Sequence, residues 1–455
     1  MEIAPDPVRS ERSAASDRPG RSHRSRPDAE TTPDRMSQMT DHLRNLVVRV
    51  QGELRALAAD ALVPIRMRRG RRKAESVEAD ARIGGWISVI LPTKDVERYI
   101  DACLRSLLGQ GYWRIEVVVV DDGSTDGTRR RLSRWERRDS RVRVLGVDYS
   151  DPNAARNHAI DHARGEYLAF LDGDDILLAG AYRDLVESLE RTGSDFAVGA
   201  YDRLVGRRRS PAAFWVDEAH QTPLERITVA EHPEIMVNAV QWSKLYRRRF
   251  WDAASMRFPE GGHFQDQIVS AKAYARAAAF DVLHRRIVSW RIRQDGSSMT
   301  QQTVLPRQIG DRFATTFAAL ELLEHEGGPA LARARLTQYL SNDIAIAAAQ
   351  LPGMGEEAYA ALRSGLTQLA PAQEQVDVWH DVPAESKVLY ALILSDDQRR
   401  ARAYIAMGGL DLLRHRLITV DGVPYVGLPY FDAPEAGLSR EWFRAAPREI
   451  RAFAA

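Results

Sequence analysis

Residues 116–127 of this 455-residue chain read EVVVVDDGSTDG. A run of four valines with no polar residue predicts a strand that is buried on both faces, as in a parallel sheet covered by helices. Two aspartates, a glycine and a serine follow at once, and these residue types favour turns and helix caps. The stretch therefore predicts a buried strand that opens into an acidic loop at its carboxyl end, where open α/β sheets bind their ligands.

Short apolar runs and amphipathic stretches alternate around this strand, which is the pattern of β-α-β units. Strands are predicted at 86–91, 115–120, 142–147 and 167–171, and helices at 96–108, 127–135 and 153–163. Polar or acidic loops also follow the first and the last of these strands, at 92–95 and 172–175. Three such loops at one edge of a sheet favour a concave site for a cation, and a cation suits a diphosphate.

Several classes of protein are disfavoured by what the sequence contains. Neither G-x-G-x-x-G nor G-x-x-x-x-G-K-[ST] is present, which argues against a dinucleotide enzyme and a P-loop enzyme. The 64 basic and 63 acidic residues give a net charge of +1, so nucleic acid is not an expected partner.

A single cysteine, Cys103, excludes an internal disulfide framework and suits a reducing compartment. With no apolar run of about 18 residues and no secretory signal, we expect a cytoplasmic protein.

Changes in composition divide the chain into three predicted parts. Residues 1–82 are predicted to form a disordered basic tail with one amphipathic helix that ends near Pro64, followed by a basic cluster at 66–73. This tail is interpreted as a linker, as a helix that self-associates into a homo-oligomer, or as a peripheral anchor on anionic lipid at the inner face of the plasma membrane. Residues 83–305 are predicted to form the α/β domain, and 306–455 a helix-rich accessory domain.

The accessory domain shows its own periodic segments. Helical spacing of apolar residues is found at 313–325, 330–351 and 356–369. Further on, residues 417–422 read LITVDG, and an Asp-Gly pair after a short apolar run predicts a β-hairpin.

The ordered motifs of the α/β domain resemble those of family 2 glycosyltransferases. The resemblance spans residues 86–298 and rests on 86–92, 116–127, 154–157 and 170–175. Later stretches, at 244–248, 264–267 and 290–293, resemble members that act on teichoic-acid-like polymers. The resemblance implies a GT-A fold, which is a Rossmann-like mixed sheet flanked by helices. It also implies inverting, metal-dependent transfer of a sugar from a nucleotide-sugar donor, a UDP-sugar first of all, to a hydroxyl of a cell-surface glycan or polyol-phosphate acceptor.

Carried over by position, the resemblance assigns roles to five residues on the donor side. Pro92 and Asp122 would contact the uracil base, with Arg156 supporting that pocket. Asp172 would lie against the ribose and the diphosphate, and Asp174 would hold Mn²⁺ or Mg²⁺ on the diphosphate. A metal there would neutralise the charge that grows on the leaving nucleoside diphosphate.

Asp266 matches the acidic position that serves as general base in the family. A carboxylate that takes the proton of the acceptor hydroxyl, opposite the leaving group, gives inversion by a single displacement. Gln265 stands where the family usually has glutamate, and the loss of this like charge predicts a lower pKa and a weaker base. Arg291 and Arg293 are interpreted either as a clamp on the diphosphate or as a solvated pair.

Two further functions stay open at this point. A sugar nucleotidyltransferase also uses acidic strand ends, but its glycine-rich N-terminal signature is absent after Leu91. A non-catalytic scaffold that binds a polymer is favoured by Gln265 and by Lys94, which replaces the usual aromatic residue beside the base. Trp242 and Tyr246, at helical spacing, are interpreted as core residues or as a platform for an acceptor sugar.

Overall fold

The computed structural model describes residues 83–293, 304–370 and 376–454. The predicted tail at 1–82, with its amphipathic helix and basic cluster, lies outside the described residues, and the interpretations placed on it stay predictions. Among the described helices, none combines the length and the apolar character that crossing a bilayer requires.

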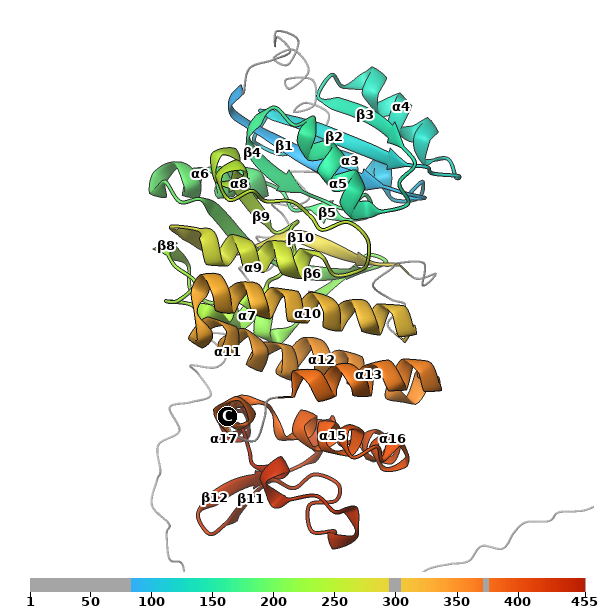
Figure 1. Cartoon of the computed structure of the whole chain (residues 1–455). Coiled ribbons are helices and arrows are strands. Elements are labelled where there is room, and N and C mark those ends of the chain that lie inside the picture. The colour runs from blue at the N-terminus through green and yellow to red at the C-terminus, as the bar shows by residue number, and fades with distance from the viewer. Residues whose placement is uncertain (1–82, 294–303, 371–375, 455) are drawn as a thin grey trace, which may run out of the picture. The chain divides into compact units, whose positions relative to one another are not determined.

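A mixed sheet forms the first part of the described chain (Figure 1). Its strands lie in the order β3-β2-β1-β4-β9-β6-β10-β5, with β7 beside β6 and β8 beside β10. Strands β3, β2, β1 and β4 are mutually parallel, whereas β9 runs antiparallel to both β4 and β6. The bounds are β1 Ile83–Thr93, β2 Ile115–Asp122, β3 Val142–Val147, β4 Gly165–Phe170, β5 Ile176–Leu177, β6 Phe196–Val205, β7 Arg208–Pro211, β8 Leu224–Ile227, β9 Lys244–Arg247 and β10 Phe280–Ile292. The predicted mixed α/β fold is confirmed.

Helices cover both faces of this sheet, as the valine run of β2 requires. Val117 and Val119 face one buried cluster, which includes side chains of α3, α4 and α6, and Val118 and Val120 face another, which includes side chains of α5, α8 and α9. The helix bounds are α3 Ile100–Leu108, α4 Thr128–Arg138, α5 Pro152–Asp161, α6 Ala181–Thr192, α7 Phe214–Ala219, η1 Pro233–Val237, α8 Arg248–Ala253 and α9 Asp266–Arg276.

The rest of the chain is helical, with one small hairpin, as the periodicity predicts. Its helices are α10 Pro306–Gly327, α11 Pro329–Gln338, η3 Tyr339–Asp343, α12 Ile344–Ala348, η4 Leu351–Gly353, α13 Glu356–Leu369, α14 Val376–Asp381, α15 Ala384–Leu394, α16 Gln398–Ala406, η5 Leu412–Arg414, η6 Pro434–Ala436, η7 Arg440–Phe443 and α17 Pro447–Ala454. The hairpin pairs β11 Leu417–Val420 with β12 Val423–Val426, and both turn residues, Asp421 and Gly422, have positive φ as a tight hairpin turn requires.

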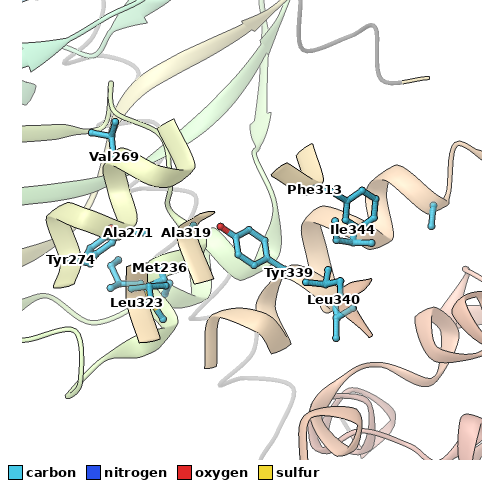
Figure 2. Packing of buried hydrophobic residues seen from close by; sticks show 14 of the residues in the cluster. Met236, Val269, Ala271, Tyr274, Phe313, Ala319, Leu323, Tyr339, Leu340 and Ile344 are labelled. Atoms are coloured by element: carbon cyan, nitrogen blue, oxygen red, sulfur yellow. The ribbon is translucent and has the colours of Figure 1, made fainter. Parts of the chain in front are cut away.

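One hydrophobic cluster joins the sheet to the helical region. Helix α10 packs on α9, and α11 and α13 pack on α10 (Figure 1). Figure 2 shows Tyr339 between Met236 of η1 and Tyr274 of α9 and, further along, Phe313 of α10 and Leu340 of η3. Helix α9 of the sheet domain and the helices from α10 onward therefore belong to one buried hydrophobic cluster. The predicted boundary near residue 305 stays a prediction.

The periodic stretch at 330–351 is helical, as expected, and contains the π-helical turn η3 between α11 and α12. One local expectation was wrong. Trp242 and Tyr246 are not at helical spacing, because Tyr246 lies in β9, which pairs with β4 and β6. Both side chains are buried, so the interpretation as core residues is confirmed.

The contact between α13 and α10 gives a test of this packing. A methyl group on Gly365 would lie 2.2 Å from the Phe313 ring, whereas one on Gly310 would meet nothing within 4 Å. Because overpacking costs about 1–3 kcal/mol, we expect Gly365→Ala to lower the free energy of unfolding in spite of its better helix propensity. Gly310→Ala, the matched control in α10, should raise it by up to about 1 kcal/mol. Urea denaturation of the full chain measures both, and equal stabilisation by the two changes would contradict the packing.

Candidate active site

The loops that follow β1, β2 and β4 meet at one edge of the sheet. Strand β1 pairs in parallel with both neighbours, and Thr93 at its end lies in register with Asp121 at the end of β2. Asp95 joins the first two loops, because its Oδ1 accepts a hydrogen bond from the backbone N of Thr125 at 2.7 Å. Its own backbone N donates to Ser124 Oγ at 3.1 Å. The predicted gathering of the three loops is therefore present.

Asp122 holds the turn that leads into α5. Its Oδ1 accepts from the backbone N of Tyr149 at 2.6 Å and of Ser150 at 2.9 Å, and its Oδ2 accepts from the backbone N of Asp151 at 3.0 Å. The side chain is buried. A carboxylate has about four acceptor positions, so these three bonds leave about one for a ligand. Asp122 is thus a structural clamp in addition to being a candidate base-binding residue.

Pro92 and Lys94 lie on either side of the last residue of β1. Pro92 is buried and pairs in register with Val120. Lys94 is exposed, and its Nζ donates to Ser150 Oγ at 3.0 Å, on the turn that Asp122 holds. The position that carries an aromatic ring in the resembling family therefore presents a cation next to the predicted base pocket.

Arg156 connects α5 to the loop after β4. Its Nη2 donates to Asp172 Oδ1 at 2.9 Å, its Nη1 donates to Asn153 Oδ1 at 3.2 Å, and its guanidinium lies 5.4 Å from the centre of the Phe258 ring. Both partners of the Arg156–Asp172 ion pair are partly exposed. The pair lies at the surface of the site, where a ligand can reach it.

The two arginines at the end of β10 turn toward the same loop. Arg293 Nε donates to Asp174 Oδ2 at 2.7 Å, and Arg291 Nε donates to the carbonyl O of Asp174 at 2.6 Å. Both guanidinium groups lie over the Tyr99 ring, at 5.5 and 5.3 Å from its centre. Of the two interpretations of these arginines, a solvated surface pair is wrong, because each is engaged with the acidic loop.

Burial and like charge act on the acids of this loop. Burial, reinforced by the charge of Asp172, raises the pKa of Asp174 even though Arg293 opposes the shift. Burial and both neighbouring carboxylates raise the pKa of Asp175 well above its usual value, and Asp175 Oδ1 accepts from the backbone N of Arg291 at 2.7 Å. The loop therefore carries more negative charge than its surroundings stabilise, as expected for residues that meet a cation.

The loop before Asp266 has an unusual backbone. Gly261, Gly262 and Phe264 all have positive φ, of 75°, 72° and 63°. Glycine adopts this conformation freely, but for a bulky residue such as phenylalanine it is strained. Strain of this kind persists where the surrounding structure enforces it, and it gathers at functional sites.

Two carboxylates hold this loop from opposite sides. Asp151 Oδ2 accepts from the backbone N of Gly261 at 2.6 Å, while Asp151 Oδ1 caps α5 by accepting from the backbone N of Asn153 at 2.8 Å. On the other side, Asp311 Oδ2 of α10 accepts from the backbone N of His263 at 3.1 Å and lies 2.7 Å from its ring Nδ1. The loop is thereby fixed between the donor-side helix α5 and the helical region.

Asp266 is the first residue of α9, and it is partly exposed. Burial raises its pKa to about 6, against the charges of Arg156 and Lys244, and the charge of Asp172 adds to the rise. Burial is the largest cause of this raised pKa. The predicted effect of Gln265, a weaker base than a glutamate at that position would give, stays a prediction.

Comparison with known proteins identifies this part of the chain. Residues 88–250 match the model of Glycosyl transferase family 2. They form a family 2 glycosyltransferase domain. The matched stretch contains the three loops after β1, β2 and β4, but it ends before Asp266, Arg291 and Arg293.

Two curated relatives show the extent of the similarity. The chain is 28% identical over 228 residues to the poly(ribitol-phosphate) beta-N-acetylglucosaminyltransferase TarS of Staphylococcus aureus, covering 49% of this chain and 38% of TarS. It is 35% identical over 117 residues to the UDP-Glc:alpha-D-GlcNAc-diphosphoundecaprenol beta-1,3-glucosyltransferase WfgD of Escherichia coli, covering 26% of this chain and 46% of WfgD. The chain thus spans less than half the length of each of these curated relatives.

A solved structure extends the likeness of fold beyond the family domain. The crystal structure of S. aureus TarS 1–349 in complex with UDP-GlcNAc superposes with a TM-score of 0.58 at 21% identity, covering 76% of this chain and 98% of that one. This likeness shows a common fold, and it confirms the GT-A sheet predicted from the motifs.

The carboxylates of Asp172 and Asp174 fit a divalent ion that binds together with substrate phosphates. In the described part of the chain, no three His, Cys, Asp or Glu side chains gather as a metal site. Asp172 and Asp174 each place one oxygen on an arginine, which leaves the other oxygen of each carboxylate for a ligand. One or two carboxylates together with substrate phosphates are the usual way in which Mg²⁺ is held.

Some site residues were missed in the sequence. Asp151 could have been recognised, because aspartate directly before Pro152 is a typical start of a helix. Asp311 gave no such signal, because it lies in a periodic helical stretch 48 residues from His263, to which it binds. Only the tertiary packing of α10 on α9 brings it to the glycosyltransferase loops.

The clamp formed by Asp122 is testable. In Asp122→Asn, either the two bonds of Oδ1 or the one of Oδ2 is lost, and an amide N–H then faces a backbone N–H. Because a buried unsatisfied donor costs about 1–3 kcal/mol, we expect the free energy of unfolding to fall by that amount. Asp148→Asn, in the same loop but exposed, should change it by less than about 0.5 kcal/mol. Urea denaturation compares the two, and equal stability would contradict the clamp.

Proposed function

We propose that this protein transfers the sugar of a nucleotide-sugar donor, a UDP-sugar first of all, to a hydroxyl of a cell-surface glycan or polyol-phosphate polymer, with inversion at the anomeric carbon. The observation that carries the proposal is Asp266, a carboxylate with a pKa of about 6 that responds to the charges of Arg156 and Asp172 on the donor-side loops. A general base works best when its pKa lies near the working pH.

The donor is proposed to lie across the loops that follow β1, β2 and β4. Pro92 and the remaining acceptor position of Asp122 would meet the base, and Asp172 would meet the ribose. Arg291 and Arg293 would meet the diphosphate, because a guanidinium presents two parallel N–H groups to phosphate oxygens. Both already lie within hydrogen-bond distance of Asp174, so the change needed to reach a ligand beside that residue is local.

A divalent cation, Mn²⁺ or Mg²⁺, is proposed to bind Asp174 together with the diphosphate. When bound, such an ion neutralises the charge that develops on the leaving nucleoside diphosphate. The raised pKa of Asp174 supports the assignment, because the ionised carboxylate lacks sufficient stabilisation from the protein.

Asp266 is proposed to take the proton of the acceptor hydroxyl. The acceptor oxygen then forms a bond to the anomeric carbon while the bond to the nucleoside diphosphate breaks, which inverts that carbon. The names of both curated relatives support inversion, since each forms a beta linkage and UDP-sugars of glucose and N-acetylglucosamine are alpha-linked. A polyol-phosphate acceptor is supported by the name of TarS.

The role of Asp266 predicts a specific pH dependence. A base must be deprotonated to act, so kcat/KM should be constant above the pKa of about 6 and should fall about tenfold per pH unit below it. Asp266→Asn keeps the shape of the side chain but accepts no proton, so turnover should fall by about 10²–10⁴-fold with little change in donor affinity. Steady-state kinetics from pH 5 to 8 and calorimetry with UDP measure these effects.

A matched control separates catalysis from helix stabilisation. Glu356 is an exposed acid at the first position of α13, so Glu356→Gln removes the same type of helix-dipole contact, worth about 0.3–1 kcal/mol, far from the loops. It should leave turnover unchanged. If Asp266→Asn behaves in the same way, losing melting temperature but keeping turnover, Asp266 is a structural acid.

The metal assignment is tested by nucleotide binding. Asp174→Asn should abolish the gain in UDP affinity that Mn²⁺ gives over EDTA, while affinity in EDTA persists because Arg293 is released from its partner. Arg293→Gln is the contrasting variant, and it should weaken UDP binding both with and without metal. Isothermal titration calorimetry distinguishes the two patterns, and an undiminished metal effect in Asp174→Asn would remove Asp174 from the site.

A further inference from the structure

Arg312 brings a positive charge from the helical region to the loop that carries Asp266. It lies in α10, outside the family match, and its guanidinium stacks over the ring of Phe264 at 4.1 Å from the centre. Phe264 precedes Asp266 by two residues and is held in a strained conformation with a φ of 63°. Next to Arg312, the carboxylate of Asp311 holds the backbone of the same loop. Arg312 is therefore fixed beside the proposed base.

The guanidinium of Arg312 has no hydrogen bond and no ion pair among the described residues. Burial lowers its pKa, and the carboxylates of Asp343 and Asp266 act against this shift from a distance. The side chain is nevertheless partly exposed, so a ligand can reach it.

Asp343 is already engaged by other residues. Its Oδ1 accepts from Gln267 Nε2 at 3.3 Å, and its Oδ2 lies 3.7 Å from Nη2 of Arg335. Gln267 Oε1 in turn accepts from Arg335 Nη2 at 2.6 Å and from the Tyr339 hydroxyl at 3.2 Å. Arg335 is thus the cation that balances Asp343, and within the described part of the chain Arg312 has no counterion in contact.

A cation that is partly desolvated and unpaired is costly, and proteins normally pair such charges. Beside a substrate site, the missing partner is expected from the ligand. The nucleoside diphosphate already has Arg291 and Arg293, which contact Asp174. The planar fork of an arginine suits the two free oxygens of a phosphodiester, to which it binds through two parallel hydrogen bonds.

We propose that Arg312 binds a phosphate group of the acceptor polymer and so positions a neighbouring hydroxyl at Asp266. The inference rests on the proposed function for the role of Asp266, but phosphate binding by Arg312 can be measured without turnover. A residue of α10, the helix that follows the glycosyltransferase sheet, would then select an anionic acceptor.

Binding of a defined ribitol-phosphate oligomer to the full chain tests the proposal. The titration is carried out with saturating UDP and Mn²⁺, so that the oligomer does not compete for Arg291 and Arg293. We expect Arg312→Gln to weaken oligomer binding by about 10- to 100-fold, the loss typical of a charge-assisted hydrogen bond. Arg312→Lys, which keeps the charge but not the fork, should fall between Arg312→Gln and the unchanged protein.

The matched control is Arg307→Gln, which removes an exposed arginine from the same helix and should leave oligomer affinity unchanged. Free ribitol tests the need for phosphate, and an oligogalacturonate of similar length tests whether a carboxylate serves as well. With a functional transferase, the oligomer KM should rise in Arg312→Gln while kcat and the pH profile remain unchanged.

Several results would overturn the proposal. These are equal oligomer affinity in Arg312→Gln and Arg307→Gln, equal affinity for ribitol and its phosphate oligomer, or preference for the uronate. A shifted pH profile in Arg312→Gln without loss of oligomer binding would make Arg312 a positioning residue for Asp266 instead. Failure of the proposed function has a different signature, because the protein would then not turn over nucleotide sugars whatever residue stands at 312.

Discussion

The hydrogen bonds of Asp122 and Asp151 connect the two halves of the active site. Asp122 accepts three backbone N–H groups of the turn before α5, and Asp151, within that turn, caps α5 and holds Gly261. Buried backbone donors have to be paired, so the turn has little freedom to move without breaking one of these bonds. The loop with Asp266 is therefore placed by the same residues that shape the loops after β1, β2 and β4. Under the proposed function, these short, charged contacts set the separation between base and donor.

Charge in the site is arranged in pairs that a substrate would have to rearrange. Asp172 is bound by Arg156 and Asp174 by Arg293, while burial raises the pKa values of Asp175 and Asp266. Under the proposed function, the diphosphate competes with the carboxylates for the arginines, and a metal competes with the arginines for the carboxylates. Binding of the diphosphate to the arginines frees the carboxylates for the metal, and binding of the metal frees the arginines for the diphosphate. A donor with its metal therefore replaces both ion pairs together.

The sequence predicted what local patterns determine. The valine run of β2, the loops at strand ends and the Asp-Gly hairpin all follow from residue types that act on their own neighbours. It failed where distant segments decide. Tyr246 lies in a strand because β9 pairs with β4 on one side and β6 on the other. Burial by the fold, which no neighbouring residue indicates, is the largest cause of the raised pKa of Asp266. Arg312 gave no signal, because its position depends on how α10 packs.

Under the proposed function, the helical region is part of the site. Gln267, next to Asp266, is bound by Arg335 and Tyr339 of the segment that includes the π-helical turn η3, and π turns are frequent at functional sites. Buried packing continues from α9 through α10 to Tyr339 (Figure 2). The family match covers the donor loops and stops at residue 250. Under the proposed function, donor chemistry and acceptor choice are therefore carried by different parts of the chain.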